Sequence, residues 1–178
     1  MPRNRDAAPA DPGPNPPASP AGAGRLEWIG VRPSSGVPMR AHEAVQARSG
    51  HGLAGDRYAR KGRREVTLVQ AEHLPLVSRR LGRAVAPAEL RRKLMVSGVD
   101  LAAFATRGFR IGEVRLEGTG PCDPCRKLAN ALGDGGMDAM LGHGGITARV
   151  VDGGVLRLGD LVGAHDRDRE PAAGLPDD

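Results

Sequence analysis

The segment Phe109-Arg110-Ile111-Gly112-Glu113-Val114-Arg115-Leu116 sets the pattern of the whole chain. Two short apolar runs, 109–111 and 114–116, are separated by a glycine and an acidic residue, and they read as two strands. Similar runs, interrupted by Gly and Pro, recur through the sequence. They lie at 26–31, 45–47, 66–69, 94–96 and 146–151. Many short strands at this spacing predict a barrel or a sandwich rather than a doubly wound parallel sheet.

One tight turn and three short helices are also expected. Asp152-Gly153-Gly154 is typical of a hairpin, since glycine readily adopts φ > 0, and it would lead into a strand at 155–158. The helices are predicted at 71–81, 87–92 and 126–132. Gly82 and Gly133 follow the first and third of these and can end them. The expected fold class is mainly β (α+β).

The two ends of the chain differ from its middle. Residues 1–24 are mostly Pro, Ala, Gly and Asp, and residues 166–178 carry five acidic and two basic side chains. Neither end holds enough apolar surface to offset the chain entropy lost on folding. We therefore expect disordered tails at 1–24 and 166–178 around one folded domain at 25–165.

The expected folded domain is strongly basic. The chain has a formal charge of +5; the N-terminal tail is neutral and the C-terminal tail contributes −3, so residues 25–165 hold +8. This charge favours an anionic partner, although a solvated surface explains most individual arginines. Nucleic acid is disfavoured, because Trp28, Tyr58, Phe104 and Phe109 offer few stacking platforms and no known DNA-binding motif is present.

The sequence also bears on location. No stretch approaches the roughly 18 apolar residues of a membrane span, and residues 1–24 lack the apolar core of a signal peptide. Two cysteines three positions apart do not make the disulfide framework of a small secreted protein. We therefore expect a cytoplasmic protein without membrane association.

Cys125, in Pro121-Cys122-Asp123-Pro124-Cys125, is the residue most expected to carry chemistry. A helix is predicted to begin at Arg126, which places Cys125 at a helix N-terminus, where N–H groups and the helix dipole stabilise an anion. Arg126 and Lys127 add positive charge. The thiol pKa should therefore be lowered, which enriches the nucleophilic and metal-binding thiolate. A buried structural cysteine is the alternative, and the polar, proline-rich surroundings argue against it.

The spacing C-x-x-C has two further interpretations. A thioredoxin-like dithiol normally follows the first strand of a βαβ unit, whereas this pair comes late in a mostly β chain. A structural zinc site needs four ligands, and the five histidines are scattered. Zinc is therefore disfavoured, the dithiol stays a lesser alternative, and the role of Cys122 is open.

Two glycine-rich loops, 50–57 and 142–145, each place a histidine among glycines. Glycine lets backbone amides approach a ligand closely, and Arg or His beside such a loop suits an oxyanion or a phosphate. Ordinary turn chemistry is the alternative for any single glycine. Neither loop matches the P-loop or the dinucleotide fingerprint.

The order of these segments resembles the MOSC domain, named for the C-terminal domain of molybdenum-cofactor sulfurases, in its small stand-alone bacterial form. The segments that carry the resemblance are 51–57, 64–72, 90–98, 109–112, 118–125 and 142–150. The resemblance covers roughly residues 26–162, and the terminal Pro-Cys makes it specific. It implies a compact β-barrel of the pyruvate-kinase-barrel type with a few helices.

The resemblance also implies that Cys125 is the reactive, catalytic residue. In relatives this cysteine either carries sulfur as a persulfide or ligates the molybdenum of a molybdopterin cofactor, and both roles suit a thiolate. Relatives of the second kind reduce N-hydroxylated compounds. The family is further associated with pyridoxal phosphate binding.

We expect Cys125 to be the metal ligand of a cofactor site. The polar residues expected around the cofactor are His51, Arg57, Arg64, Lys93, His143 and Arg149. Two positions depart from the family's pattern: Arg92-Lys93 stands where Arg-Asn is common, and Glu65 stands where Gln is common. Lys93 only donates, which puts activity in doubt if it contacts the cofactor. A strand surface would tolerate Glu65.

Three functions are therefore open. The first is a molybdenum-cofactor-dependent reductase of a small N-hydroxylated substrate, which needs a separate electron donor. The second is a sulfur carrier that is loaded on Cys125 by a separate cysteine desulfurase. The third is a non-catalytic anion- or nucleic-acid-binding module, whose binding would depend steeply on salt and not on Cys125.

Overall fold

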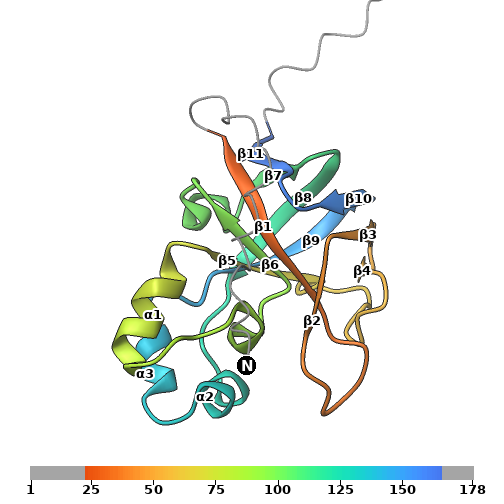
Figure 1. Ribbon diagram of the computed structural model, residues 1–178. Coiled ribbons are helices and arrows are strands. Elements are labelled where there is room, and N and C mark those ends of the chain that lie inside the picture. Colours follow the sequence, from red (N-terminus) through yellow and green to blue (C-terminus); the bar gives the residue numbers. More distant parts are fainter. Residues whose placement is uncertain (1–22, 166–178) are drawn as a thin grey trace, which may run out of the picture.

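The computed structural model describes residues 23–165, in which seven strands close into a mixed β-barrel (Figure 1). In order around the barrel they are β1 (Gly24–Val31), β6 (Leu94–Ser97), β5 (Val66–Gln70), β9 (Ile146–Asp152), β8 (Val114–Pro121), β7 (Gly108–Ile111) and β11 (Leu161–Ala164). Strand β11 pairs with β1, Gly24 opposite Val162, and closes the barrel. The pairing of β5 with β6 is parallel, and the other pairings around the barrel are antiparallel.

Burial along the strands explains the closure. In β8, Val114 and Leu116 are fully buried while the alternate residues Arg115 and Glu117 are partly exposed, so one face of the strand points into the barrel. The same alternation fills the barrel with Val, Ile, Leu and one aromatic ring, Phe109. The predicted barrel fold is confirmed, and so are the strands expected within it.

A second, three-stranded sheet lies beside the barrel. Its order is β10 (Gly154–Arg157), β3 (Ala44–Arg48) and β4 (Gly52–Leu53), and the short β2 (Arg40–His42) extends β1. The sequence did not predict β2, β4 or β11. Strands β2 and β4 are only three and two residues long, and β11 pairs with β1, which lies at the other end of the described chain.

The hairpin predicted at 152–154 is wrong. Strand β10 pairs with β3 and not with β9, and neither Gly153 nor Gly154 has a positive φ. Strand β8 pairs with one edge of β9 as far as Asp152. On the other edge the pairing with β5 ends at Ala148, and beyond it Val150 bonds to the Glu65 carboxylate and the N–H of Gly50. A Cβ at Gly153 would lie 2.7 Å from the carbonyl oxygen of Ala47, so this glycine lets the chain pass close to β3 and join the second sheet.

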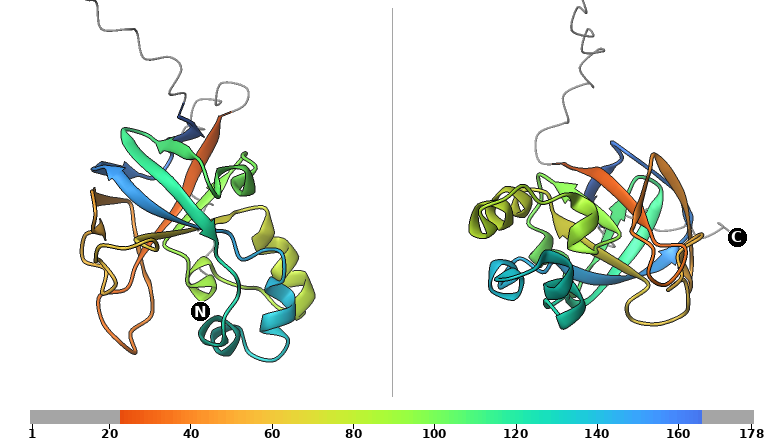
Figure 2. Two further views of the ribbon diagram at one scale, coloured as in Figure 1. Left: turned by 180° about the vertical axis from the view of Figure 1, so that it is seen from behind. Right: turned by 60° about the horizontal axis from the view of Figure 1, so that its bottom comes forward.

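Three α-helices gather beyond one end of the barrel (Figures 1 and 2). They are α1 (His73–Leu81), α2 (Arg126–Leu132) and α3 (Gly136–Met140), and two 3₁₀-helices accompany them, η1 (Pro87–Leu90) and η2 (Leu101–Phe104). Helix α2 has the predicted bounds, and η1 is tighter and shorter than the predicted helix. Helix α3 was not predicted, because five residues that begin with glycine carry no helical periodicity. No described helix is long and apolar enough to span a membrane.

A second apolar core fixes the helices to the barrel. Strand β5 is buried on both faces: Leu68 points into the barrel core, and Val69 belongs to the second core, which it shares with Met95 of β6. Leu128 and Leu132, one helical turn apart, anchor α2 in this core. The N-terminus of α2 is thereby held next to the end of β8.

Candidate functional site

Cys125 is the N-cap residue of α2. Strand β8 ends at Pro121, and after a three-residue link Cys125 adopts an extended backbone with φ −129° and ψ 167°. Its carbonyl oxygen accepts hydrogen bonds from the N–H groups of Leu128 and Ala129, each at 2.9 Å. The side chain is exposed and makes no capping hydrogen bond, which leaves the sulfur accessible.

The pKa of the Cys125 thiol lies below its ordinary value. Partial burial is the largest single influence and raises the pKa, but four other groups together outweigh it. These are the backbone N–H groups of Leu128 and Lys127 and the guanidinium groups of Arg92 and Arg91. The direction and the part played by the helix N–H groups agree with the prediction, but the positive charges come from Arg92 and Arg91 and not from the expected side chains of Arg126 and Lys127. The thiolate is therefore enriched near neutral pH.

Cys125 lies at the edge of a cavity of about 590 Å³, here called the Cys125 cavity. Eight of its fourteen lining residues are basic and none is acidic. They come from the loop before β5, the segment before β6 and the start of α2: Arg60, Lys61, Arg63, Arg64, Arg91, Arg92, Lys93 and Lys127. A cavity with this charge attracts anions.

Arg92 connects three segments of the cavity wall by hydrogen bonds. Its buried guanidinium donates to three carbonyl oxygens, of Gly144 (2.7 Å), Cys122 (3.0 Å) and Leu90 (3.3 Å). Burial lowers its pKa, while the sulfurs of Cys122 and Cys125 act in the opposite direction. Arg92 therefore ties the Pro-Cys link to the glycine loop at 142–145, and its charge faces the two thiols.

Lys93 forms a buried ion pair. Its Nζ lies 2.9 Å from Oδ1 of Asp56 and donates to the carbonyl oxygen of Glu65 at 2.8 Å. Asp56 also accepts from the backbone N–H groups of Arg32 and Tyr58. The cation in place of the usual Asn is thus neutralised within the protein, and it anchors the glycine loop 50–57 beneath the cavity.

Glu65 is buried rather than on a strand surface, so the expectation of a tolerant surface position is wrong. Its Oε2 accepts from the N–H of Val150 at 2.9 Å, and its Oε1 accepts from the N–H of Gly62 at 3.3 Å. The carboxylate precedes β5 and faces the edge of β9, where a backbone donor needs an acceptor. Glu65 therefore positions the basic loop that borders the cavity.

Cys122 lines the same cavity as Cys125 but is buried. A guanidinium nitrogen of Arg64 lies 3.5 Å from the sulfur of Cys122. The backbone N–H of Cys122 donates to the carbonyl oxygen of Gly145. Both cysteines are free thiols. The structure thus gives the two cysteines different settings, one accessible and one enclosed.

Of the six polar residues expected around the cofactor, Arg64 and Lys93 line the Cys125 cavity. Two others belong to the glycine loop 50–57 and do not line it. His51 is exposed in the turn after β3, and the guanidinium of Arg57 lies 4.6 Å from the centre of the Tyr58 ring. Tyr58, the residue that follows this loop, lines the cavity, so an aromatic ring takes the place of the expected cation and histidine.

His143 and Arg149 also lie outside the lining of the cavity. The ring of His143 packs against that of His73, with centroids 4.5 Å apart, and Arg149 forms an ion pair with Glu117 across β8 and β9. Arg149 faces outward because residues alternate along β9 and its neighbours Ala148 and Val150 fill the barrel. The loop at 142–145 instead contributes the carbonyl oxygen that Arg92 binds.

Four of the eight basic residues that line the cavity were not predicted from the sequence. Arg60, Lys61, Arg63 and Arg91 were not singled out, although the run Arg60-Lys61-Gly62-Arg63-Arg64 concentrates four charges in five residues. This concentration of positive charge was the feature of the sequence that could have identified these residues as part of the site. Its position opposite Cys125 could not be predicted, because it depends on how the loop before β5 crosses the end of the barrel.

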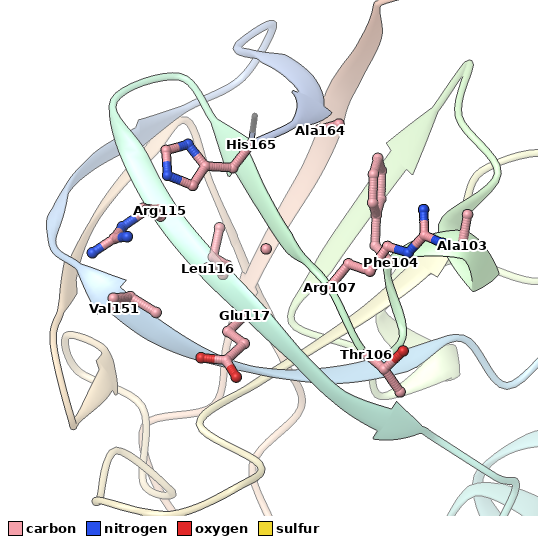
Figure 3. A pocket seen from close by; sticks show the side chains of 11 residues that line it. Ala103, Phe104, Thr106, Arg107, Arg115, Leu116, Glu117, Val151, Ala164 and His165 are labelled. Atoms are coloured by element: carbon pink, nitrogen blue, oxygen red, sulfur yellow. The ribbon is translucent and has the colours of Figure 1, made fainter. Parts of the chain in front are cut away.

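A separate hollow of about 450 Å³ lies against β7 and β8 (Figure 3). Arg107, Arg115, Glu117 and His165 line it together with Phe104, so its charges are of both signs. Arg115 is paired with Asp152 at 2.6 Å, and Glu117 is paired with Arg149. This hollow shares no residue with the Cys125 cavity and holds no cysteine. The Cys125 cavity is therefore the candidate site.

Comparisons with known proteins agree with this architecture. Residues 43–163 match the MOSC domain family. The structure is similar to the YuaD protein of Bacillus subtilis, at 20% identity and a TM-score of 0.65 over 79% of this chain and 94% of that one. It is also similar to YiiM from Geobacillus stearothermophilus, at 18% identity and a TM-score of 0.67 over 81% of this chain and 76% of that one. YiiM from Escherichia coli matches at 21% identity and a TM-score of 0.60, over 80% and 70%. No curated protein matches the chain.

Proposed function

Because the chain belongs to the MOSC domain family, we propose that the Cys125 cavity binds a molybdenum cofactor. In this proposal the Cys125 thiolate is the protein ligand of the molybdenum, and the protein reduces N-hydroxylated compounds. The observation that carries the proposal is an accessible thiol with a lowered pKa, at the edge of a cavity whose charged lining residues are all basic.

The residues present fit such a group. A pterin cofactor carries a phosphate, and Arg63, Arg64, Lys61 and Lys127 around the cavity offer it cationic donors. Within residues 23–165 no cluster of three or more His, Cys, Asp or Glu side chains could hold a metal ion. A metal at Cys125 would therefore need further ligands from a cofactor, and the soft thiolate would be a suitable ligand for it.

The residues of this chain have distinct tasks in the proposed reaction. Cys125 would hold the metal, and Lys61, Arg63, Arg64 and Lys127 would hold the phosphate. Arg92 keeps the Pro-Cys link against the glycine loop. The bound cofactor supplies two-electron redox chemistry. Reduction of an N-hydroxylated compound consumes two electrons and two protons, breaks the N–O bond and releases the amine and water. The electrons come from a separate donor protein, and the protons come from solvent through the open cavity.

Metal analysis tests the proposal directly. Protein purified from a host that makes molybdopterin should contain molybdenum in the wild type and in Cys122→Ser, and none in Cys125→Ser. Cys122→Ser is the matched control, because it removes a sulfur from the same cavity without removing the accessible thiolate. Equal molybdenum in Cys125→Ser, or none in the wild type, would show that Cys125 is not a metal ligand.

A sulfur carrier is the second candidate function, and the exposure of Cys125 favours it. The thiolate would attack the terminal sulfur of a cysteine desulfurase persulfide; the S–S bond breaks, and the desulfurase thiolate leaves. Mass spectrometry after incubation with a desulfurase and cysteine should then find one added sulfur atom on Cys125. An unmodified Cys125 under conditions that load another acceptor would remove this candidate.

A further inference from the structure

Arg91 has a backbone conformation that non-glycine residues rarely adopt. Its φ is +54°, and it is the only non-glycine residue of 23–165 with a positive φ. It follows the 3₁₀-helix η1 in the left-handed region, and its N–H donates to the carbonyl oxygen of Ala88 at 3.3 Å. A side chain in this region costs conformational energy, so the surrounding structure holds Arg91 in place against that cost.

This conformation places Arg91 between two cavities. It lines the Cys125 cavity, and it also lines a smaller one of about 310 Å³, here called the Arg32 cavity. Arg32 lines the smaller cavity and not the larger one. Arg91 is the only residue that the two linings share, so the two spaces meet at its side chain.

The two arginines of the smaller cavity are not paired with a carboxylate in the described part of the chain. Among the described residues, neither guanidinium forms an ion pair or a side-chain hydrogen bond. Burial lowers the pKa of Arg32, and Arg91 lowers it further, while nearby Asp56 raises it. Asp56 is itself paired with Lys93, and Glu89 at the edge of the cavity is paired with Arg83 at 2.8 Å. The acidic groups nearby are thus already engaged.

Apart from the two arginines and Glu89, the lining of the smaller cavity is apolar. Its walls are Val37, Pro38 and Met39 on one side and Ala88 and Ala131 on the other. Two unpaired guanidinium groups beside apolar walls suit a phosphate joined to an organic ring. We propose that Arg32 and Arg91 form a phosphate subsite next to the Cys125 cavity, and that its ligand is a ring-bearing phosphate ester. The subsite does not depend on a metal at Cys125.

Calorimetric titration of the full chain with adenosine monophosphate, a phosphate ester that carries a ring, tests the subsite. The wild type should bind it. Arg91→Gly and Arg32→Gln should each weaken binding about tenfold or more, since each removes charge-assisted hydrogen bonds to the phosphate. Arg126→Gln is the control, because Arg126 is exposed and lines neither cavity; it should bind as the wild type does.

Arg91→Gly separates binding from folding. Glycine adopts a positive φ without strain, so the variant should melt at the same temperature as the wild type or higher, and a loss of binding cannot reflect unfolding. Arg32→Gln separates the two cavities, because Arg32 lines only the smaller one. If Arg91→Gly weakens binding and Arg32→Gln does not, the phosphate occupies the Cys125 cavity and the second subsite is wrong.

Two other results would also overturn the subsite. One is an absence of binding in the wild type, and the other is an equal loss in Arg126→Gln, which would indicate general charge attraction. Molybdenum content measured on the same preparations keeps this outcome apart from the proposed function. Molybdenum at Cys125 without nucleotide binding would remove the subsite alone, and nucleotide binding without molybdenum would remove the metal role alone.

Discussion

At the scale of single residues, the two cysteines differ in access although they line one cavity. Cys125 is exposed at the start of α2, and Cys122 is buried beside Arg64. The position of Cys125 at the N-terminus of α2, together with Arg91 and Arg92, lowers the pKa of its thiol and so favours the thiolate. Chemistry that needs a nucleophile or a metal ligand should therefore be confined to one of the two sulfurs.

Alkylation by iodoacetamide should show this difference. Cys125 should react with a pH midpoint below the value of about 8.5 that is ordinary for a cysteine, because the thiolate is the reactive form. Cys122 should react only after unfolding. Peptide mapping by mass spectrometry across a pH series measures both rates in one sample. A midpoint for Cys125 equal to that of the denatured chain would contradict the lowered pKa.

Lys93 makes a second prediction at this scale. The side chains of Lys93 and Asp56 are only 8% and 1% exposed, so removal of one partner leaves a buried charge unpaired. Lys93→Asn, which introduces the residue common in the family's pattern, should lower the free energy of unfolding by about 3–5 kcal/mol. Urea denaturation measures the loss. The double variant Lys93→Asn with Asp56→Asn should recover part of it, and an unchanged Lys93→Asn would show that the pair contributes little.

At the scale of elements, the glycine loop at 142–145 joins α3 to β9 and braces the site. Gly144 provides the carbonyl oxygen that Arg92 binds, and Gly145 accepts from the N–H of Cys122. Gly145 has φ +83°, and a Cβ there would lie 1.8 Å from the carbonyl oxygen of Leu68. Gly142 has φ +77° but open space around it. Both glycines therefore have a positive φ, but only at Gly145 would a side chain collide with the backbone of β5.

Alanine substitutions at these two glycines separate the cost of a positive φ from the cost of a steric clash between the new Cβ and the backbone of β5. Gly142→Ala should cost about 1 kcal/mol, the penalty of a positive φ alone. Gly145→Ala should cost about 3 kcal/mol or more, because the backbone of β5 must also move. Thermal unfolding compares them. Similar losses in both variants would mean that the loop yields easily at Gly145.

The packed rings of His73 and His143 link this loop to α1. The Nδ1 atom of each ring is buried without a hydrogen-bond partner among the described residues. Burial lowers the pKa of His73, His143 lowers it further, and Glu72 opposes both; burial and Arg80 lower the pKa of His143. Below about pH 6.5, the ordinary histidine pKa, the unfolded chain therefore binds protons that the folded protein does not.

Stability should consequently fall as the pH drops from about 6.5 through the lowered pKa values of the two histidines. His143→Gln removes one of these groups, so its free energy of unfolding should fall less over the same interval. Urea denaturation at pH 7 and pH 5 measures both proteins. A loss in His143→Gln as large as that in the wild type would assign the pH dependence to other groups.

At the scale of the whole molecule, eight cations line one cavity in a domain that carries +8. Their mutual repulsion is relieved when an anion binds, and a ligand that binds only the folded state stabilises it. Phosphate should therefore raise the melting temperature more than sodium chloride of equal ionic strength. The gain should be on the order of several degrees at about 100 times the dissociation constant.

A double variant, Arg63→Gln with Arg64→Gln, identifies the source of this gain. Both residues line the Cys125 cavity and neither is part of an ion pair among the described residues. The phosphate effect should shrink in this variant, whereas general salting-out by phosphate would leave it unchanged. Scanning calorimetry in the two salts distinguishes these outcomes.

Local patterns predicted most of the fold and only part of the site. Apolar runs located all the barrel strands except β11, and the leucine spacing with its following glycine located α2, so the position of Cys125 at a helix start was predictable. The pairing between strands that are far apart in the sequence was not predictable. Strand β10 joins β3 across more than a hundred residues, and β11 finds β1, without any signal within either segment. The cavity depends on such pairings.

The site residues divide in the same way. Arg64 and Lys93 line the cavity, whereas His143 and Arg149 do not, because an outward or inward direction is set by register and packing. Arg60, Lys61 and Arg63 lie on an irregular loop. The path of such a loop cannot be predicted from sequence periodicity. Binding of pyridoxal phosphate, associated with the family, stays a prediction.

The pairing of β1 with β11 has a consequence for protein engineering. Gly24 stands opposite Val162, so the first and last strands of the barrel are neighbours. A short linker could therefore join them, and new ends could be opened in a surface loop without loss of the barrel. For the same reason the domain can be spliced into an exposed loop of a host protein, because its entry and exit lie together. Such a fusion would carry Cys125 and its cavity into the host as one unit.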